Sequence, residues 1–346
     1  MNFLVCDLSL IDRPQLIGKN DRFMSYENPG CDANWDSEIH APISWHSYAA
    51  AMNGRIVCAP ADNWKEHIKW ADIVLALWNF NPKVAMQAIH DMKRLGRKVI
   101  GAFHENGDTF QWHAKDLDWL RNFKNCANAC DAMLTYPRDK VYKNIYTSMG
   151  ITCQLLYIPQ PYYTKKRFGY IIPKHERRGI FIAPRRKLTE IERRNWIYNI
   201  IISTQLIGKE YNTAGVIANR ITTINDSQVP NEILANQLKA VFDGYNIEVI
   251  PPLEYHSYLK MIAGHQVTIN LDSSDTQGQV DADSVFVDVP LYQPPGFDFR
   301  TDFGDIYHDL LGNGLNDDQS IASIMNDISS FTTVREKIGQ LYEQTD

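Results

Sequence analysis

The fold of this chain is most readily inferred from the run Asp275-Thr-Gln-Gly278-Gln-Val-Asp-Ala-Asp283-Ser-Val-Phe-Val-Asp-Val-Pro290-Leu291. An apolar segment, Val267-Thr-Ile-Asn-Leu271, and a polar turn, Asp272-Ser-Ser274, come before it. The apolar segment predicts a strand, and the run after Gly278 predicts a helix. A strand that leads through a glycine-containing turn into a helix presents unpaired backbone N–H groups and the positive end of the helix dipole. The run therefore predicts an α/β unit whose turn can hold a phosphate group.

Two carboxylates, Asp275 and Asp283, frame this turn eight residues apart. One precedes the first helical turn and the other lies inside the helix, so both can face the same ligand. We expect one to be directed toward a sugar and the other toward a ribose diol. The alternative is that Asp275 only caps the helix, as in any α/β protein.

The arrangement resembles the donor-site signature of the retaining, family-4-like glycosyltransferases of the GT-B fold. That signature has a Glu, a Gly three residues on, a second Glu eight after the first, and a Pro seven further on. This chain has Asp275, Gly278, Asp283 and Pro290 at those offsets. It departs from the signature in two respects. Both Glu positions are Asp, one methylene shorter, and the Gly usually found two residues before the Pro is Asp288.

Short apolar runs alternate with helical patterns along most of the chain. Strands are expected at 3–8, 55–58, 73–77, 98–103, 132–135, 153–158, 179–183, 214–217, 247–250 and 267–271. Helices are expected at 83–95, 117–128, 139–149, 188–203, 231–243 and 254–263, with a last candidate at 319–343. Strands spaced by helices predict mostly parallel, doubly wound sheets.

The pattern restarts after a basic linker that contains prolines, and the length of 346 residues suits two domains. The fold class is therefore α/β with two facing Rossmann-like domains, as the GT-B resemblance implies. The predicted N-terminal acceptor domain covers 1–165, and a C-terminal helix at about 325–346 packs back on it. The predicted nucleotide-sugar donor domain covers 176–324.

Composition limits the cellular setting and the chemistry. No apolar run approaches the ~18 residues of a membrane span, and the N-terminus lacks a basic leader and a long apolar core. The six cysteines are scattered, and the Cys126–Cys130 pair has no partner His or Cys pair for zinc. These features predict a cytoplasmic protein with free thiols. The sequence also lacks a P-loop and a G-x-G-x-x-G after a strand, so NTP hydrolysis and dinucleotide binding have no support.

One histidine stands where the resemblance implies a site residue. His104 directly follows the strand expected at 98–103, and the carboxyl ends of such strands are where α/β sheets bind ligands. Similar enzymes carry a His there, close to the donor sugar. The alternative is a loop histidine that bonds a neighbour.

A basic loop follows the strand expected at 179–183. In the resembled family a basic pair at this point neutralises the donor diphosphate, and here Arg185, Arg186 and Lys187 occupy it. The family's Arg-to-Lys spacing of five is not reproduced, because residue 190 is Glu. Which of the three takes the role stays open, and a solvated basic loop is the alternative.

The resemblance implies a metal-independent, retaining hexosyl- or pentosyltransferase that moves a sugar from a nucleotide-sugar donor to an unidentified acceptor, without a cofactor. It places His104 and Asp275 at the reacting sugar and Asp283 at the ribose. The amides of Gly278, Gln279 and Val280 and the basic loop would hold the diphosphate. A sugar-nucleotide epimerase of the same architecture and a non-catalytic GT-B-like protein that binds a nucleotide or polyanion remain alternatives.

The linker region is strongly basic. Residues 165–194 hold eleven Lys and Arg against three Glu, in a chain whose formal net charge is −6. Part of this stretch is expected to guide an anionic acceptor such as a nucleic acid, a phosphorylated glycan or a lipid. The alternative is a solvated linker. The residues selected for this role are Lys165, Lys166, Arg167, Arg177 and Arg178.

Overall fold

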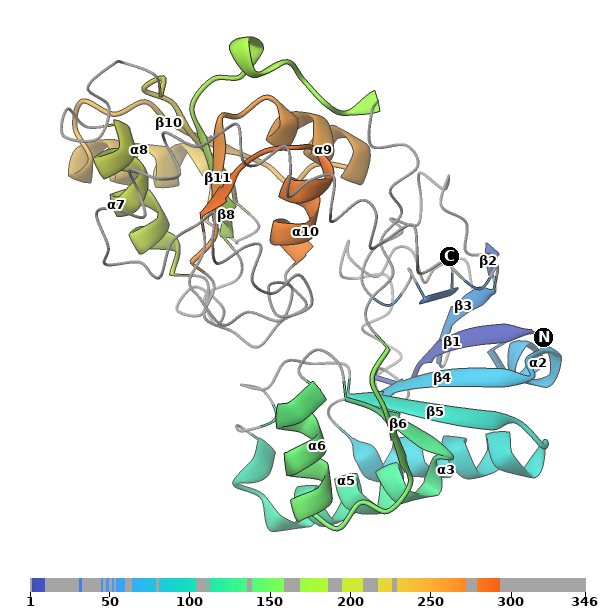
Figure 1. Cartoon of the computed structure of the whole chain (residues 1–346). Coiled ribbons are helices and arrows are strands. Elements are labelled where there is room, and N and C mark those ends of the chain that lie inside the picture. Colours follow the sequence, from blue (N-terminus) through green and yellow to red (C-terminus); the bar gives the residue numbers. More distant parts are fainter. Residues whose placement is uncertain are drawn as a thin grey trace. The chain divides into compact units, whose positions relative to one another are not determined.

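The computed structural model describes residues 2–9, 31–32, 45, 48–49, 52, 54–59, 64–78, 81–103, 110, 113–135, 139–158, 169–185, 195–207, 217–225, 229–271 and 279–292. The chain divides into two compact units, and the second begins at Thr164. Each unit is an α/β arrangement with its own sheet (Figure 1). No helix of the described residues is long and apolar enough to cross a membrane.

The first unit is built on a seven-stranded sheet in the order β2-β3-β1-β4-β5-β6-β7. All neighbouring strands are parallel except β2, which runs antiparallel to β3. Its strands are β1 (Phe3–Asp7), β2 (Cys31–Asp32), β3 (Arg55–Cys58), β4 (Ile73–Trp78), β5 (Lys98–Phe103), β6 (Ala132–Leu134) and β7 (Gln154–Leu156). Its helices are α2 (Trp64–Trp70), α3 (Pro82–Arg94), α5 (Leu117–Ala129) and α6 (Asp139–Ser148).

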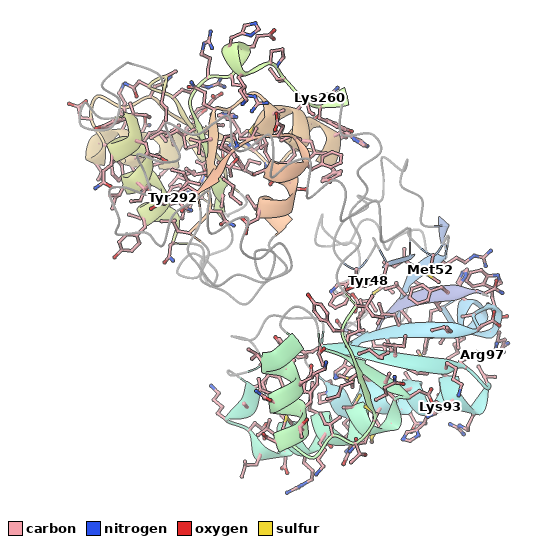
Figure 2. The ribbon with its side chains drawn as sticks, viewed as in Figure 1. Tyr48, Met52, Lys93, Arg97, Lys260 and Tyr292 are labelled. Carbon is pink, nitrogen blue, oxygen red and sulfur yellow. The ribbon has the colours of Figure 1, made fainter. Side chains whose placement is uncertain are left out.

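The strands at the centre of this sheet bury side chains on both faces, as parallel strands between helical layers do. On β1, Leu4 and Cys6 join one core cluster, whereas Phe3 and Val5 join another. On the second face, Tyr48 (labelled in Figure 2) donates from its hydroxyl to the carbonyl of Ile158 at 2.8 Å. The sheet is therefore packed on both faces by residues that are distant in the sequence.

Gly101 on β5 shows how tightly one of these layers is packed. A β-carbon at this position would collide with the ring of Trp78 and the sulfur of Met133. Both neighbours are fully buried. The close approach of a large ring to the strand backbone therefore requires glycine here.

Local capping signals set where two of these helices begin. Asn81 precedes α3, and its Oδ1 accepts the N–H of Val84 at 3.3 Å, with Pro82 as the first helical residue. Asp116 precedes α5, and its Oδ1 accepts the N–H of Asp118 at 2.9 Å. Each side chain satisfies a helix N–H that has no partner within the helix.

The second unit has a five-stranded parallel sheet in the order β10-β9-β8-β11-β12. The strand order reverses between β8 and β11, and α/β sheets bind ligands outside the carboxyl ends of the strands at such a point. Its strands are β8 (Ile180–Arg185), β9 (Ile221–Asn225), β10 (Ile247–Ile250), β11 (Val267–Ile269) and β12 (Leu291–Tyr292). Its helices are the 3-10 turn η4 (Lys174–Glu176), α7 (Trp196–Ile207), α8 (Asn231–Val241), α9 (Tyr255–Ala263) and α10 (Gln279–Phe286).

The predicted α/β fold class is confirmed by these two sheets. Most of the strand expected at 214–217 lies outside the described residues. The strand between β8 and β10 lies at 221–225, where none was predicted. Its polar residues are buried because they have specific partners. Thr222 Oγ1 lies 2.9 Å from His265 Nε2, and Thr223 Oγ1 accepts the indole N–H of Trp196 at 2.9 Å. The predicted helix at 319–343, and with it the packing of 325–346 on the first domain, lies outside the described residues.

His265 gives the second unit a dependence on pH. Burial lowers the pKa of its imidazole to about 4 from the ordinary 6.5. The folded unit therefore favours the neutral ring, and this stability is fully present above pH 6.5 and is lost as the pH falls toward 4. The loss amounts to about 3 kcal/mol for the two to three pKa units involved.

We expect hydrogen-exchange protection of β8, β9 and β11 to fall between pH 7 and pH 4.5, after correction for the intrinsic exchange rate. In His265→Gln, which cannot titrate, this part of the pH dependence should vanish. Protection of β1 and β4 in the first unit serves as the internal control. The same pH dependence in wild type and variant would show that another group is responsible.

Candidate functional site

The strand that leads into the 275–290 stretch is anchored at its last described residue. Leu271 follows β11, and its backbone N–H donates to Asn199 Oδ1 at 2.9 Å. Its carbonyl accepts from Asn195 Nδ2 at 2.6 Å. Asn195 has a φ of 48°, a left-handed conformation that asparagine tolerates better than most residues. The start of α7 therefore holds the point from which the chain enters the turn.

The helix after the turn is also tied to the sheet. Asp281 in the first turn of α10 is fully buried, and its Oδ1 accepts from Asn270 Nδ2 at 2.6 Å. Asn270 in turn donates its backbone N–H to the carbonyl of Tyr292, labelled in Figure 2, at 2.9 Å. A carboxylate at a helix N-terminus is favoured by the helix dipole. Asp281 is accordingly a structural group that fixes the start of α10 relative to β11 and β12.

Asp283 lies on α10 and faces the neighbouring helix α9. Its side chain is enclosed, with 1% of its surface exposed. Its Oδ1 accepts from the hydroxyl of Tyr255 at 3.3 Å. An enclosed carboxylate is stabilised by hydrogen-bond donors, and Tyr255, the first residue of α9, supplies one.

The end of the stretch contains a residue in an uncommon backbone conformation. Asp288 has a φ of 63°, in the left-handed region that favours glycine. It lies two residues before Pro290, at the position where the resembled signature has Gly. Asp288 thus adopts a conformation that favours glycine, which Asp and Asn enter at lower cost than most residues.

Asp288 is held in place by an arginine from the linker. Arg177 Nη2 lies 3.3 Å from Asp288 Oδ2, with 3% and 5% of the two side chains exposed. Arg177 Nη1 also donates to the backbone carbonyl of Asp288, and its Nε donates to the carbonyl of Ile172 at 2.9 Å. The ion pair therefore joins the segment before β8 to the end of the stretch.

Part of the predicted site falls on described residues. Val280 and Asp283 are both buried on α10, and Gln279 is the first residue of that helix. Arg185 ends β8 at the carboxyl edge of the sheet. The side chains of Gln279 and Arg185 are not among those described. The predicted residues that lie outside the described part of the chain are His104, Lys165, Lys166, Arg167, Arg186, Lys187, Asp275 and Gly278.

Two arginines of the basic linker have structural partners, which corrects one expectation. Arg177 was expected to guide an anionic acceptor, but it is buried in the ion pair with Asp288. Arg178 donates from Nη1 to the carbonyls of His175 and Arg177, at 2.6 Å and 2.7 Å. The charge of Arg177 is thus used inside the unit, because an enclosed Asp288 needs a cation.

Sequence reasoning missed Tyr255, Asn195 and Asn199. Tyr255 contacts a residue 28 positions away, and Asn199 contacts one 72 positions away. Such pairs have no local sequence pattern. One available signal was the placement of Tyr255 near the start of the helix that follows the strand predicted at 247–250, since strand ends bind ligands in α/β sheets.

The described residues contain no group of three or more His, Cys, Asp or Glu that could hold a metal ion. Five cysteines with described side chains are free thiols, and all belong to the first unit: Cys6, Cys58, Cys126, Cys130 and Cys153. Burial raises the pKa of each of these thiols above its ordinary value. They therefore stay protonated at neutral pH, as core residues do.

The Arg177–Asp288 pair generates a double-mutant prediction. Arg177→Met leaves an enclosed carboxylate without its cation and should destabilise the second unit by about 3–5 kcal/mol. Adding Asp288→Gly removes that carboxylate and places glycine at the positive φ, so most of the loss should be recovered. Urea unfolding of the wild type, both single variants and the double variant measures the coupling. Additive losses would show that the pair does not interact.

No protein-family model and no curated protein sequence matches the chain. Solved structures do match over its whole length. One, from E. coli, is a trehalose-6-phosphate protein bound with UDP-2-fluoro glucose, with a TM-score of 0.59, 10% identity, and coverage of 100% of this chain and 96% of its own. A sucrose-phosphate synthase from Thermosynechococcus elongatus has a TM-score of 0.55, 13% identity, and coverage of 100% and 99%.

A third structure is a trehalose-6-phosphate synthase studied for the mechanism of enzymatic glycosyltransfer with retention. Its TM-score is 0.55 at 9% identity, and it covers 100% of this chain and 96% of its own. At these identities the likeness concerns the fold. It confirms the fold expected from the resemblance of the 275–290 stretch. The chain therefore has the GT-B fold of these glycosyltransferases.

Proposed function

We propose that the protein is a glycosyltransferase that moves a sugar from a nucleotide-sugar donor to an acceptor, with retention and without a metal ion. The observation that carries this proposal is the left-handed conformation of Asp288. This conformation favours glycine, the residue that the resembled signature has at that position, and so supports the resemblance. The GT-B fold and the relative that is bound with UDP-2-fluoro glucose support the same function.

The donor would bind at the carboxyl edge of the second sheet. Backbone N–H groups at the start of α10 have no partners within the helix, so they can donate to the diphosphate. Among the cations after β8, Arg suits phosphate better than Lys, because its fork matches two oxygens. In our proposal Arg185 or Arg186, with Lys187, takes this role, and the amides of Gly278, Gln279 and Val280 complete the diphosphate site.

The reaction would then rest on leaving-group stabilisation. The bond between the anomeric carbon and the phosphate oxygen breaks, and its electron pair stays on the nucleoside diphosphate. The acceptor oxygen bonds to the anomeric carbon, and its proton passes to the departing diphosphate oxygen. Fixed cations and N–H groups stabilise the charge that develops on the diphosphate. We propose that Asp275 and His104 contact the donor sugar at the reacting face, and that Asp283 lies beside the ribose.

A donor screen tests this function. We expect calorimetry with UDP, GDP, ADP, CMP and dTDP sugars to find one donor that binds, and turnover with its acceptor to survive excess EDTA. Loss of activity on chelation, restored by manganese or magnesium, would contradict the metal-independent mechanism. Conversion of the donor without an acceptor would identify an epimerase. Binding without any turnover would identify a non-catalytic protein.

The two carboxylates should respond differently to substitution. Asp283→Ala should weaken nucleotide binding by about 1.5–3 kcal/mol, because the ionised group that orders the ribose site is lost. Asp275→Ala should mainly lower kcat. Calorimetry and steady-state kinetics on both variants measure these effects. Wild-type affinity and kinetics in both would remove the donor-site assignment.

We propose that the acceptor is anionic, because the linker is strongly basic. Lys165, Lys166 and Arg167 would guide it, and ionic strength should screen this effect, with a Debye length of ~10 Å at 0.1 M. Reversal of all three to Glu should raise the acceptor KM and flatten its salt dependence while donor affinity is unchanged.

A matched control changes the net charge equally in the first unit. It reverses three exposed lysines, Lys65, Lys69 and Lys83, to Glu. This control should leave the acceptor KM unchanged. An acceptor KM that does not vary across about 50–300 mM salt in any of these proteins would identify the linker as a solvated segment.

A further inference from the structure

Tyr255 and Asp283 form a polar pair between two helices of the second unit. Tyr255 is the first residue of α9 and follows β10 after four residues, so it lies at the carboxyl edge of the sheet. Asp283 comes from α10, and its Oδ1 accepts from the Tyr255 hydroxyl at 3.3 Å. The pair therefore stands on the side of the sheet where α/β folds bind their ligands.

The two members of the pair differ in exposure. Asp283 is enclosed, with 1% of its surface exposed, whereas Tyr255 is half-buried. Tyr255 is thus the more accessible member of the pair. Asp is also one methylene shorter than the Glu of the resembled signature. Both facts favour a contact that is made through Tyr255.

The chemistry of the phenol allows such a contact. A tyrosine hydroxyl has one proton and also accepts hydrogen bonds through its lone pairs. Because the proton is directed to Asp283 Oδ1, the oxygen of Tyr255 can accept from a ribose hydroxyl. The carboxylate then acts by orienting the phenol, and hydrogen bonds in such a chain strengthen one another.

Aromatic packing fixes the separation of the two helices that carry the pair. Tyr170 from the linker stacks on His256 with ring centroids 6.0 Å apart, and its hydroxyl is hydrogen-bonded to His256 Nδ1. The same Tyr170 ring lies 5.8 Å from Phe286, one turn after Asp283 on α10. One residue of the linker thus bridges the start of α9 and the end of α10. This packing pre-organises Tyr255 against Asp283.

We propose that the Tyr255 hydroxyl, oriented by Asp283, contacts the ribose of the donor nucleotide. This inference rests on the proposed donor site and assigns the ribose contact to a residue outside the signature. The pair together does what a longer carboxylate does alone, and it gives the site a preference for ribonucleotides over deoxyribonucleotides.

The test compares each nucleoside diphosphate of a panel (UDP, GDP, ADP and CDP) with its 2′-deoxy and 3′-deoxy analogues by calorimetry. Wild-type protein should bind the preferred ribonucleotide about tenfold more tightly than at least one deoxy analogue, as expected for one good hydrogen bond. In Tyr255→Phe this ratio should fall to within about twofold, because the ribonucleotide loses its partner and the deoxy analogue loses nothing. The ratio is taken within one protein, so a lower folded fraction does not alter it.

Tyr258→Phe is the matched control. Tyr258 lies on the same helix one turn later, is also half-buried, and packs against Phe181 at 6.0 Å between ring centroids. The ratio of ribonucleotide to deoxynucleotide affinity in Tyr258→Phe should equal that of the wild type.

A second variant keeps the inference testable if Tyr255→Phe does not fold. Asp283→Asn removes the charge, but its carbonyl oxygen still accepts the Tyr255 proton. The ratio of ribonucleotide to deoxynucleotide affinity in this variant should then stay within about threefold of the wild-type ratio. Collapse of discrimination in Asp283→Asn, or wild-type discrimination in Tyr255→Phe, would show that the carboxylate itself binds the ribose and would overturn the inference. Those results would leave the proposed function standing, whereas failure of every nucleotide to bind would overturn both.

Discussion

The second unit depends on an enclosed ion pair between Arg177 and Asp288. Two charges with almost no exposure are costly to bury, and they are retained only if geometry and further hydrogen bonds compensate. Here the guanidinium also bonds the backbone of Asp288 and the carbonyl of Ile172. The pair thereby stabilises Asp288 in a left-handed conformation that favours glycine. It also holds the linker segment that carries Arg177.

Around this pair the polar residues of the unit follow one design. Polar groups after β10 and β11 have partners on or beside neighbouring helices: Asn270 with Asp281, the backbone of Leu271 with Asn195 and Asn199, and Tyr255 with Asp283. Side-chain amides and carboxylates that bond across elements set positions more sharply than apolar packing does, because their geometry is directional. These hydrogen bonds thus position the carboxyl edge of the sheet.

Sequence reasoning succeeded where structure is local and failed where it depends on distant partners. Strand β5, with its apolar run at 98–103, begins and ends where the pattern predicts. Strand β9 was not predicted because Thr222 and Thr223 are polar, and their burial is favourable because of hydrogen bonds to His265 and Trp196. Arg177 was expected to guide an anionic acceptor because of its charge, but its partner lies 111 residues away within the same unit. The stretch at 275–290 identified the fold because its turn, glycine and helix are contiguous, whereas the partner of Asp283 lies on another helix.

The free thiols of the first unit have a practical consequence. The five cysteines with described side chains belong to the unit that carries β1 to β7, and burial raises the pKa of these thiols, so their nucleophilic thiolate is scarce in the native protein. An alkylating reagent therefore reacts with these cysteines mainly when that unit opens. The alkylation rate of these cysteines therefore reports local unfolding of the first unit. Ligand binding that stabilises only the second unit would leave this rate unchanged.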